Sequence, residues 1–420
     1  MKKLLEGAKD TLRNTQLYIP LLWWRGRAQE QRYAQIACHA ASVTPDVFAP
    51  PGWNVRTRQM LSTRWSRSRP PLQSLNQARV LIVDGTQMSP WWLQNEVQRA
   101  MDAVVFSLHR HKRGYTQGVS DLVSFSTQDL RQGWAPSLAS ADLDAYHSRL
   151  QEDLLACARS AHTERPLDLC IIYAPNGTVS PETLAGIRQL GAAVCSWWLD
   201  EKHAFDIHAG NMEGCGAIAQ GVHLHLTNSL EAVRWYVARG EPAYYFPQAV
   251  DPTGVTAVPR DKDIAVSFVG AAYAWRMDFV RRLRRLGIAV ACFGKGWENG
   301  QVEDALDVYS RSVINLGIGD TGLSRRLTCL KGRDFAVLGS GAFYLTTYDV
   351  ELARLFDIGR EVCCYRNEYD CAELIRYYLE RPEEAASIGA AARARCLAEH
   401  TWTHRFIALL RWLGILQEQS

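Results

Sequence analysis

The chain has 420 residues, of which 47% are hydrophobic and 22% charged, so it is long enough for two ordinary domains with cores of their own. This composition excludes a fibrous or wholly disordered protein. The formal net charge of +3 is small for this length and by itself predicts no polyanionic partner.

The cysteines indicate a reducing compartment. There are eleven, none forms a Cys-x-x-Cys pair, and Cys363 directly precedes Cys364, which favours free thiols over a disulfide framework or a zinc site. The charged start of the chain forms no apolar signal core, and the apolar patch at 17–24 is interrupted by Pro20 and too short to cross a bilayer. We therefore expect a cytoplasmic protein, soluble or peripheral to the inner face of the membrane.

Residues 1–78 differ from the rest of the chain because Pro and Arg are frequent, acids are few and helical patterns are short. They predict a basic N-terminal extension that is mainly helical or irregular. Its cations near Trp65 could contact nucleic acid, lipopolysaccharide, an anionic membrane or an acidic protein. These cations are Arg56, Arg58, Arg64, Arg67 and Arg69.

From Arg79 onward, short apolar runs alternate with amphipathic segments, which predicts a first α/β domain over 79–250. Its strands are expected at 80–83, 103–106, 169–173, 192–197 and 222–226. Its helices are expected at 91–101, 143–161, 181–190 and 229–238.

The same scheme repeats over 251–401, after a segment in which Pro247 and Pro252 indicate a linker. Strands are expected at 264–268, 289–293, 313–316, 342–345 and 362–365. Helices are expected at 276–286, 331–338, 350–356, 372–380 and 382–398, and an amphipathic helix follows at 402–416.

Buried strands separated by amphipathic helices are typical of parallel sheets that are covered on both faces. The sequence therefore predicts two Rossmann-like, doubly wound domains that face a cleft. Ligands bind such sheets outside the carboxyl ends of the strands, so the candidate site should lie there.

Several short phrases follow strand ends or flank helices in the second half of the chain. They are Ser267-Phe-Val-Gly270 with Arg276 after it, Phe293-Gly-Lys-Gly-Trp297, Lys331-Gly-Arg-Asp-Phe335, Gly339-Ser-Gly341 and Glu399-His-Thr401. In this order the chain resembles the CgeB-like, spore-maturation branch of group 1 glycosyltransferases, whose members have the GT-B fold. The resemblance is strongest over 197–402, weaker over 79–168 and absent before. It implies that a C-terminal helical segment, 402–420, crosses back to the first domain.

The resemblance also implies that the second domain binds a nucleoside-diphosphate sugar. Gly270 would let a phosphate approach backbone amides, and Arg276 would neutralise the diphosphate. Lys295 could meet a phosphate and Trp297 could stack on the base, although the Lys295 loop also has the composition of a plain surface turn. The full set of expected donor-binding residues is Gly270, Arg276, Lys295, Trp297, Lys331, Arg333, Asp334, Ser340 and Gly341.

The chain departs from the family at two positions. Ala336 stands where the family usually has a glutamate that resembles a ribose-binding residue, and Thr328 stands where many relatives have another. Losing such a charged acceptor costs on the order of 1.5 to 3 kcal/mol. Either the donor differs, another residue such as Asp334 compensates, or catalysis has been lost.

In the first domain, an aromatic strand ends at Asp200, a candidate general base, and His203 is a rival base because its ordinary pKa suits proton removal near neutrality. An acidic loop that caps the next helix is the alternative interpretation. Trp198 and Asn176 are candidate acceptor-binding residues. His223 and His225 share one face of a strand without evident further ligands, so no metal is assigned.

These patterns predict a metal-independent glycosyltransferase that moves a sugar from a nucleoside-diphosphate sugar to a glycan, lipid-linked glycan or protein, without a cofactor. A catalytically impaired partner subunit of the same fold is one alternative. A phage-type transferase that modifies bases in nucleic acid is another, with the basic extension holding the DNA.

Overall fold

The computed structural model describes residues 18–43, 52–84, 99–108, 140–174, 178–199, 201–205, 215–217, 220–255 and 260–418. These residues form two compact units. Unit 1 contains the described residues of 1–36 and of 255–398, and unit 2 contains those of 37–254 and 399–420.

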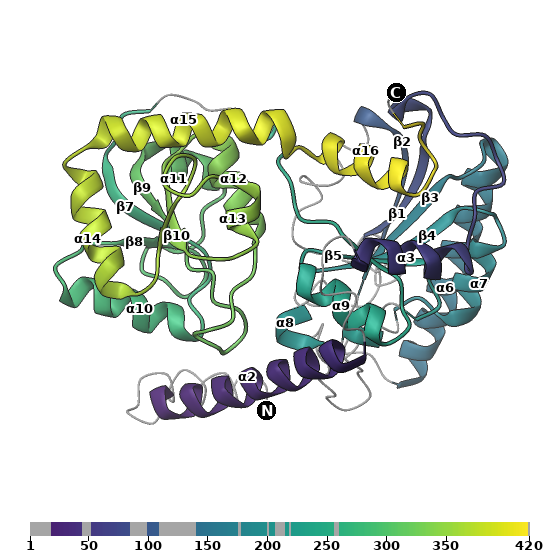
Figure 1. The fold of residues 1–420 in the computed structure, drawn as a ribbon, viewed down its shortest axis with the longest axis horizontal. Coiled ribbons are helices and arrows are strands. Elements are labelled where there is room, and N and C mark those ends of the chain that lie inside the picture. Colours follow the sequence, from purple (N-terminus) through teal and green to yellow (C-terminus); the bar gives the residue numbers. More distant parts are fainter. Residues whose placement is uncertain are drawn as a thin grey trace. The chain divides into compact units, whose positions relative to one another are not determined.

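Unit 2 is built on a parallel sheet whose strands, among the described residues, follow the order β2-β1-β3-β4-β5-β6 (Figure 1). The five predicted strands are present, and β6 is an additional short edge strand. The predicted helix at 91–101 lies mostly outside the described residues. The strands are β1 (Arg79–Asp84), β2 (Asp102–Ser107), β3 (Leu169–Tyr173), β4 (Ala193–Trp198), β5 (Leu224–Thr227) and β6 (Ala243–Tyr245).

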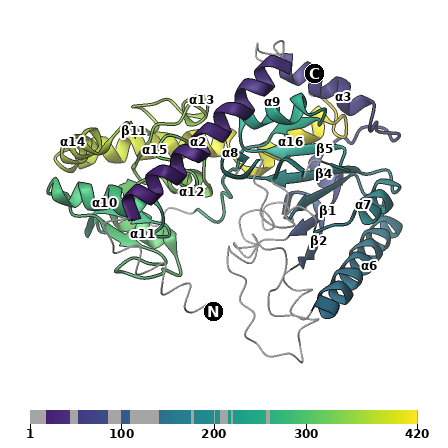
Figure 2. The ribbon, with the colours of Figure 1, turned by 90° about the horizontal axis from the view of Figure 1, so that it is seen from below.

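Alternating strand residues of unit 2 pack against different helices. Val80 and Ile82 of β1 belong to a core that includes α16 (Trp402–Trp412), whereas Leu81 and Val83 face a core that includes α6 (Ser140–Glu164). Figures 1 and 2 show α6 and α7 side by side on their face of the sheet. The helices are α3 (Gly52–Ser62), α6 (Ser140–Glu164), α7 (Pro181–Arg188), α8 (Glu201–Ala204), α9 (Leu230–Ala238) and α16 (Trp402–Trp412), with 3-10 turns at Leu75–Gln77 and Cys215–Ala217.

The C-terminal helix α16 belongs to unit 2 although the preceding residues belong to unit 1. Thr401 caps its first turn by accepting a hydrogen bond from the His404 amide. Trp402 and Phe406 are buried in the same core as Trp197 of β4. A backbone bridge between Leu72 and Leu416 ties the end of the chain to the segment before β1.

Unit 1 has a second parallel sheet, with the order β11-β10-β9-β7-β8 among the described residues. Its five strands match the predicted ones within a few residues: β7 (Ile264–Val269), β8 (Ala291–Phe293), β9 (Ser312–Leu316), β10 (Tyr344–Thr347) and β11 (Cys363–Tyr365). The predicted helices are present, and α11 is additional. They are α10 (Trp275–Arg285), α11 (Ala305–Arg311), α12 (Gly332–Ser340), α13 (Leu352–Leu355), α14 (Glu368–Leu379) and α15 (Pro382–Glu399). Figure 1 shows α10 and α14 beside the sheet.

The N-terminal segment is divided between the units rather than set apart as one extension. Its helix α2 (Tyr18–Val43) has 26 residues, so the expectation of only short helices is wrong there. Pro20 lies in the first turn, where its missing amide hydrogen costs no helical hydrogen bond. Leu22 packs on Trp275, and Gln29 donates to the Thr321 carbonyl and accepts from the Leu323 amide. Tertiary contacts, which local patterns do not reveal, stabilise this helix.

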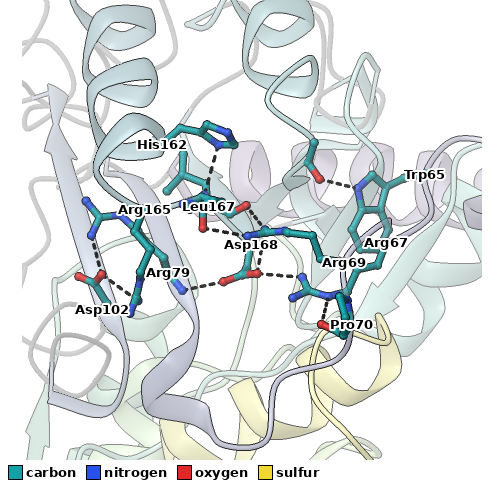
Figure 3. Close-up of polar contacts among 12 residues, drawn as sticks. Trp65, Arg67, Arg69, Pro70, Arg79, Asp102, His162, Arg165, Leu167 and Asp168 are labelled. Atoms are coloured by element: carbon teal, nitrogen blue, oxygen red, sulfur yellow. Dashed lines mark hydrogen bonds and ion pairs between the residues drawn. The ribbon is translucent and has the colours of Figure 1, made fainter.

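Three of the arginines near Trp65 bind groups within unit 2. Arg67 and Arg69 converge on the buried carboxylate of Asp168 at 2.8 and 2.9 Å (Figure 3). Arg64 pairs with Glu241 at 2.5 Å. These three cations therefore hold the segment onto the sheet. Because they already pair with carboxylates of the protein, they support the predicted binding of an anionic partner less well.

Candidate functional site

The predicted donor-binding residues converge in part at the carboxyl edge of the unit 1 sheet. Gly270 directly follows β7, Arg276 lies in the first turn of α10, and Arg333 lies in the first turn of α12. The loop after the central strand β9 brings Asp320 to the same edge. Parallel strands direct their carboxyl ends to one side, which is why Gly270 and Arg333, more than sixty positions apart, meet here.

The absence of a side chain at Gly270 makes room for the two guanidinium groups. A Cβ at this position would lie 2.8 Å from Arg333 Nη1 and 3.5 Å from Arg276 Nη1. A Cβ on Gly294, which follows β8, would overlap the Gly270 carbonyl oxygen. A side chain at Gly294 would clash with the backbone of Gly270, and a side chain at Gly270 would displace the Arg333 guanidinium, so glycine suits both positions.

The two guanidinium groups are held by neutral partners. Arg333 donates to the carbonyls of Val269 at 2.9 Å and Ile318 at 3.0 Å. Arg276 is 6% exposed, donates to the Ala271 carbonyl at 3.2 Å and stacks on the Tyr273 ring. Neither forms an ion pair within the described part of the chain, and Arg276 Nε has no hydrogen-bond partner there.

The pKa values of two charged residues at this sheet edge, Arg276 and Asp320, are shifted from their ordinary values. Burial, and then the charge of Arg333, lowers the pKa of the Arg276 guanidinium. Burial raises the pKa of Asp320 to about 7, although Arg276, Arg325 and Lys331 oppose the shift. Two close cations with neutral partners make a site that an anion would stabilise.

Other residues of the Lys331–Phe335 phrase stabilise the protein itself. Asp334 is buried, and its carboxylate accepts hydrogen bonds from the Lys331 amide at 2.6 Å and from the Tyr344 hydroxyl at 2.5 Å. Burial raises the pKa of Asp334. Lys331 Nζ lies 2.8 Å from Cys329 Sγ. Both carboxylate oxygens of Asp334 accept hydrogen bonds from groups of the protein itself. This does not favour the idea that Asp334 replaces a missing glutamate as an acceptor for ligand hydroxyl groups.

Two further phrases also have local structural contacts. Ser340 caps the end of α12 by donating to the Val337 carbonyl, and Gly341 follows in the left-handed conformation at φ 82°. Trp297 donates to the Gly270 carbonyl at 2.8 Å and packs edge-on against Phe268. Trp297 thus supports the backbone at Gly270, and Lys295 is exposed nearby in the same turn.

The positions without glutamate contain no substitute carboxylate. Thr328 donates its hydroxyl to Asp349 at 2.6 Å. Ala336 lies on α12 with no polar side-chain atom.

The predicted acceptor residues are only partly described. Asp200 and Asn176 lie outside the described residues. His203 lies in α8, but its side chain is not described. Trp198, at the end of β4, packs edge-on against Tyr173, and its buried Nε1 has no hydrogen-bond partner among the described residues. These roles stay predictions.

The two histidines of this unit are structural. The ring nitrogens of His223 lie 3.0 Å from the Val194 amide nitrogen and 3.1 Å from Arg188 Nε, and the neutral ring accepts a hydrogen bond from one of them. His225 is fully buried between Ser196, at 2.8 Å, and Glu201, at 3.3 Å. Within the described part of the chain no three His, Cys, Asp or Glu side chains are grouped to hold a metal ion, and metal independence itself stays a prediction. No described helix is long and apolar enough to cross a bilayer.

Sequence reasoning missed Asp320 and Gly294. The signal for Asp320 was an acid that follows a buried strand and a Gly-Ile-Gly turn, 317–319. The signal for Gly294 was its place in the Phe293–Trp297 phrase, directly after a predicted strand. Both lie at strand ends, where the fold positions ligands.

Comparison with known proteins gives a family for part of the chain and a fold for most of it. Residues 276–411 match a family described as glycosyl transferase-like. No curated protein matches the sequence. A glycosyltransferase from Rickettsia africae ESF-5 is similar in structure, with a TM-score of 0.53, 9% identity and coverage of 82% of this chain and 100% of that one. Sucrose-phosphate synthase from Thermosynechococcus elongatus is also similar in structure, with a TM-score of 0.50 and 11% identity. The similarity covers 80% of this chain and 99% of that one.

The chain therefore has the GT-B fold, and the match to the glycosyl transferase-like family extends over residues 276–411. The more specific resemblance to the CgeB-like branch stays a prediction.

Proposed function

We propose that this protein is a metal-independent glycosyltransferase that moves a sugar from a nucleoside-diphosphate sugar, bound by unit 1, to a glycan, lipid-linked glycan or protein acceptor. The CgeB-like branch is the one that its motifs resemble. The family match over 276–411 and the GT-B fold support the class of enzyme.

The observation that carries the proposal is the pair Arg276 and Arg333 at Gly270. Two guanidinium groups close together without ion pairs repel each other, and the nearby carboxyl groups of Asp334 and Asp320 offset only part of that repulsion. A diphosphate offers negative charge and several acceptor oxygens, so it would stabilise both guanidinium groups and accept from the unpartnered Arg276 Nε.

In the proposed reaction, the bond between the anomeric carbon and the diphosphate oxygen breaks, and a bond from that carbon to an acceptor oxygen forms. Negative charge then develops on the leaving nucleoside diphosphate. Arg276 and Arg333 stabilise that charge, which is a form of electrostatic catalysis. Asp200 or His203 of unit 2 removes the proton of the acceptor hydroxyl, and Trp198 and Asn176 contact the acceptor.

The proposal is tested by thermal unfolding with UDP, GDP, dTDP, UDP-glucose, GDP-mannose and dTDP-glucose. A ligand at about one hundred times its dissociation constant should add roughly 2.7 kcal/mol to the free energy of unfolding. Arg276→Gln should weaken binding of that ligand at least about tenfold, because it removes a charge-assisted contact of roughly 1.5 to 3 kcal/mol.

Arg285→Gln is the matched control, because Arg285 is exposed on the same helix and the variant should bind like the wild type. If no nucleotide stabilises the folded wild type, the proposal is wrong. Release of the free nucleoside diphosphate from a bound nucleotide-sugar then separates a transferase from the impaired partner subunit, which would bind without turnover.

A further inference from the structure

Asp320 lies in a loop that the rest of unit 1 holds firmly. The Gly319 amide donates to Thr347 Oγ1 at 3.1 Å, and the Thr321 amide donates to the Leu327 carbonyl at 2.9 Å. Gln29 of α2 and the Trp275 indole bind the backbone of the same loop. The position of the Asp320 backbone is therefore well determined by its neighbours.

The Asp320 carboxylate, in contrast, makes no hydrogen bond or ion pair with any residue that the structure describes. The charge of Arg276 acts to lower the pKa of Asp320, but the two side chains form no ion pair. Partly buried carboxylates are normally paired or hydrogen-bonded. The loop is therefore held in place, and its carboxylate lies at the same sheet edge as Arg276 Nε, which also has no hydrogen-bond partner among the described residues.

The pairing of the loop relates Asp320 to Thr328. These two residues form an isolated antiparallel bridge, and residues directly opposite in such a pair have side chains on the same side, with Cβ atoms about 5 Å apart. Asp320 therefore presents a carboxylate next to one of the positions where a glutamate was expected. Thr328 itself is bound to Asp349.

We propose that Asp320 accepts hydrogen bonds from hydroxyl groups of the donor sugar and so determines which nucleotide-sugar is bound. This inference rests on the proposed function, because it assumes that Arg276 and Arg333 bind the diphosphate. Asp320 then contacts the sugar, which a free nucleoside diphosphate lacks.

The test compares two dissociation constants in each protein, one for a nucleoside diphosphate and one for its sugar derivative. The pairs are UDP and UDP-glucose, GDP and GDP-mannose, and dTDP and dTDP-glucose, measured by calorimetry with wild type, Asp320→Ala and Asp320→Asn. In Asp320→Ala, compared with the wild type at about pH 8, where most of the Asp320 carboxyl groups are ionised, the nucleotide-sugar should bind about tenfold more weakly, or worse, because a charged acceptor is lost. The free diphosphate should bind equally or more tightly, because a negative charge near Arg276 is gone.

Asp357→Asn is the matched control, a surface carboxylate of unit 1, and should change neither constant. Asp320→Asn keeps the shape of the side chain, so it provides the measurement if Asp320→Ala does not fold. A variant in which both constants change by the same factor, or in which neither changes, would overturn the role of Asp320 while leaving the proposed function intact. Wild-type protein that binds none of the six compounds would overturn both.

Discussion

His225 shows how one buried residue couples this fold to pH. It is fully buried, and burial lowers its pKa from 6.5 to about 3, with the charge of Glu241 opposing the shift. The folded protein therefore keeps the imidazole neutral, whereas the unfolded chain binds a proton below about pH 6.5. Stability from this residue is complete above that pH and is lost as the pH falls towards 3.

We predict that the free energy of unfolding falls by a few kcal/mol between pH 6.5 and 4, measured by urea unfolding. His225→Gln should unfold with a shallower pH dependence, even if it is less stable at every pH. His39→Gln, a change at an exposed histidine of α2, should keep the wild-type slope. Equal slopes in wild type and His225→Gln would contradict the prediction.

At the scale of elements, the segment before β1 is attached to the sheet through one carboxylate. Asp168 Oδ1 accepts from Arg67 and Arg69, and Oδ2 accepts from the Arg79 amide at 2.9 Å. The side chains of Arg67 and Asp168 are 7% and 3% exposed. Removing one partner of such a pair leaves an uncompensated buried charge.

We therefore predict that Asp168→Ala lowers the free energy of unfolding by about 3 to 5 kcal/mol, measured by chemical denaturation. Asp102→Ala is the matched control. The Asp102 side chain is 37% exposed, and Arg79 keeps Glu164 as a partner at 2.6 Å, so the loss should stay within about 1 kcal/mol. Similar losses in the two variants would show that burial does not decide the strength of this contact.

At the scale of the whole molecule, the last residues of the chain complete a core that begins hundreds of residues earlier. Trp402, Phe406, Leu409 and Leu410 of α16 are buried against the unit 2 sheet. Each buried side chain of this kind contributes about 1.5 to 3 kcal/mol. Their sum is comparable to the whole stability of an ordinary domain.

We predict that deletion of residues 402–420 abolishes cooperative folding of unit 2, seen as loss of amide protection in β1, β3 and β4 by hydrogen exchange. Deletion of 418–420 alone should have little effect, because it leaves the backbone hydrogen bond from Gln417 to Leu72 intact. Unchanged protection in the longer deletion would show that α16 is dispensable for the core.

The sequence by itself determined the two parallel sheets, because runs such as Val80–Val83 and amphipathic helices between them bury apolar surface in only one class of architecture. It also pointed to Gly270, Arg276 and Arg333, since residues at strand ends and at helix starts are placed by local structure. Two elements were not predicted from the sequence. The strand β6 has only three residues, and the helix α2 is stabilised by contacts with residues about three hundred positions away.

Only the tertiary structure decided which polar residues of the candidate site are engaged internally. Asp334 and Trp297 have side chains suited to a ligand, but each is bound to neighbouring protein groups. Asp320 is an ordinary acid in the sequence and becomes a candidate because its loop is held while its carboxylate has no partner among the described residues. The physical reason is that hydrogen bonding and burial depend on contacts distant in sequence, whereas strand and helix patterns are local.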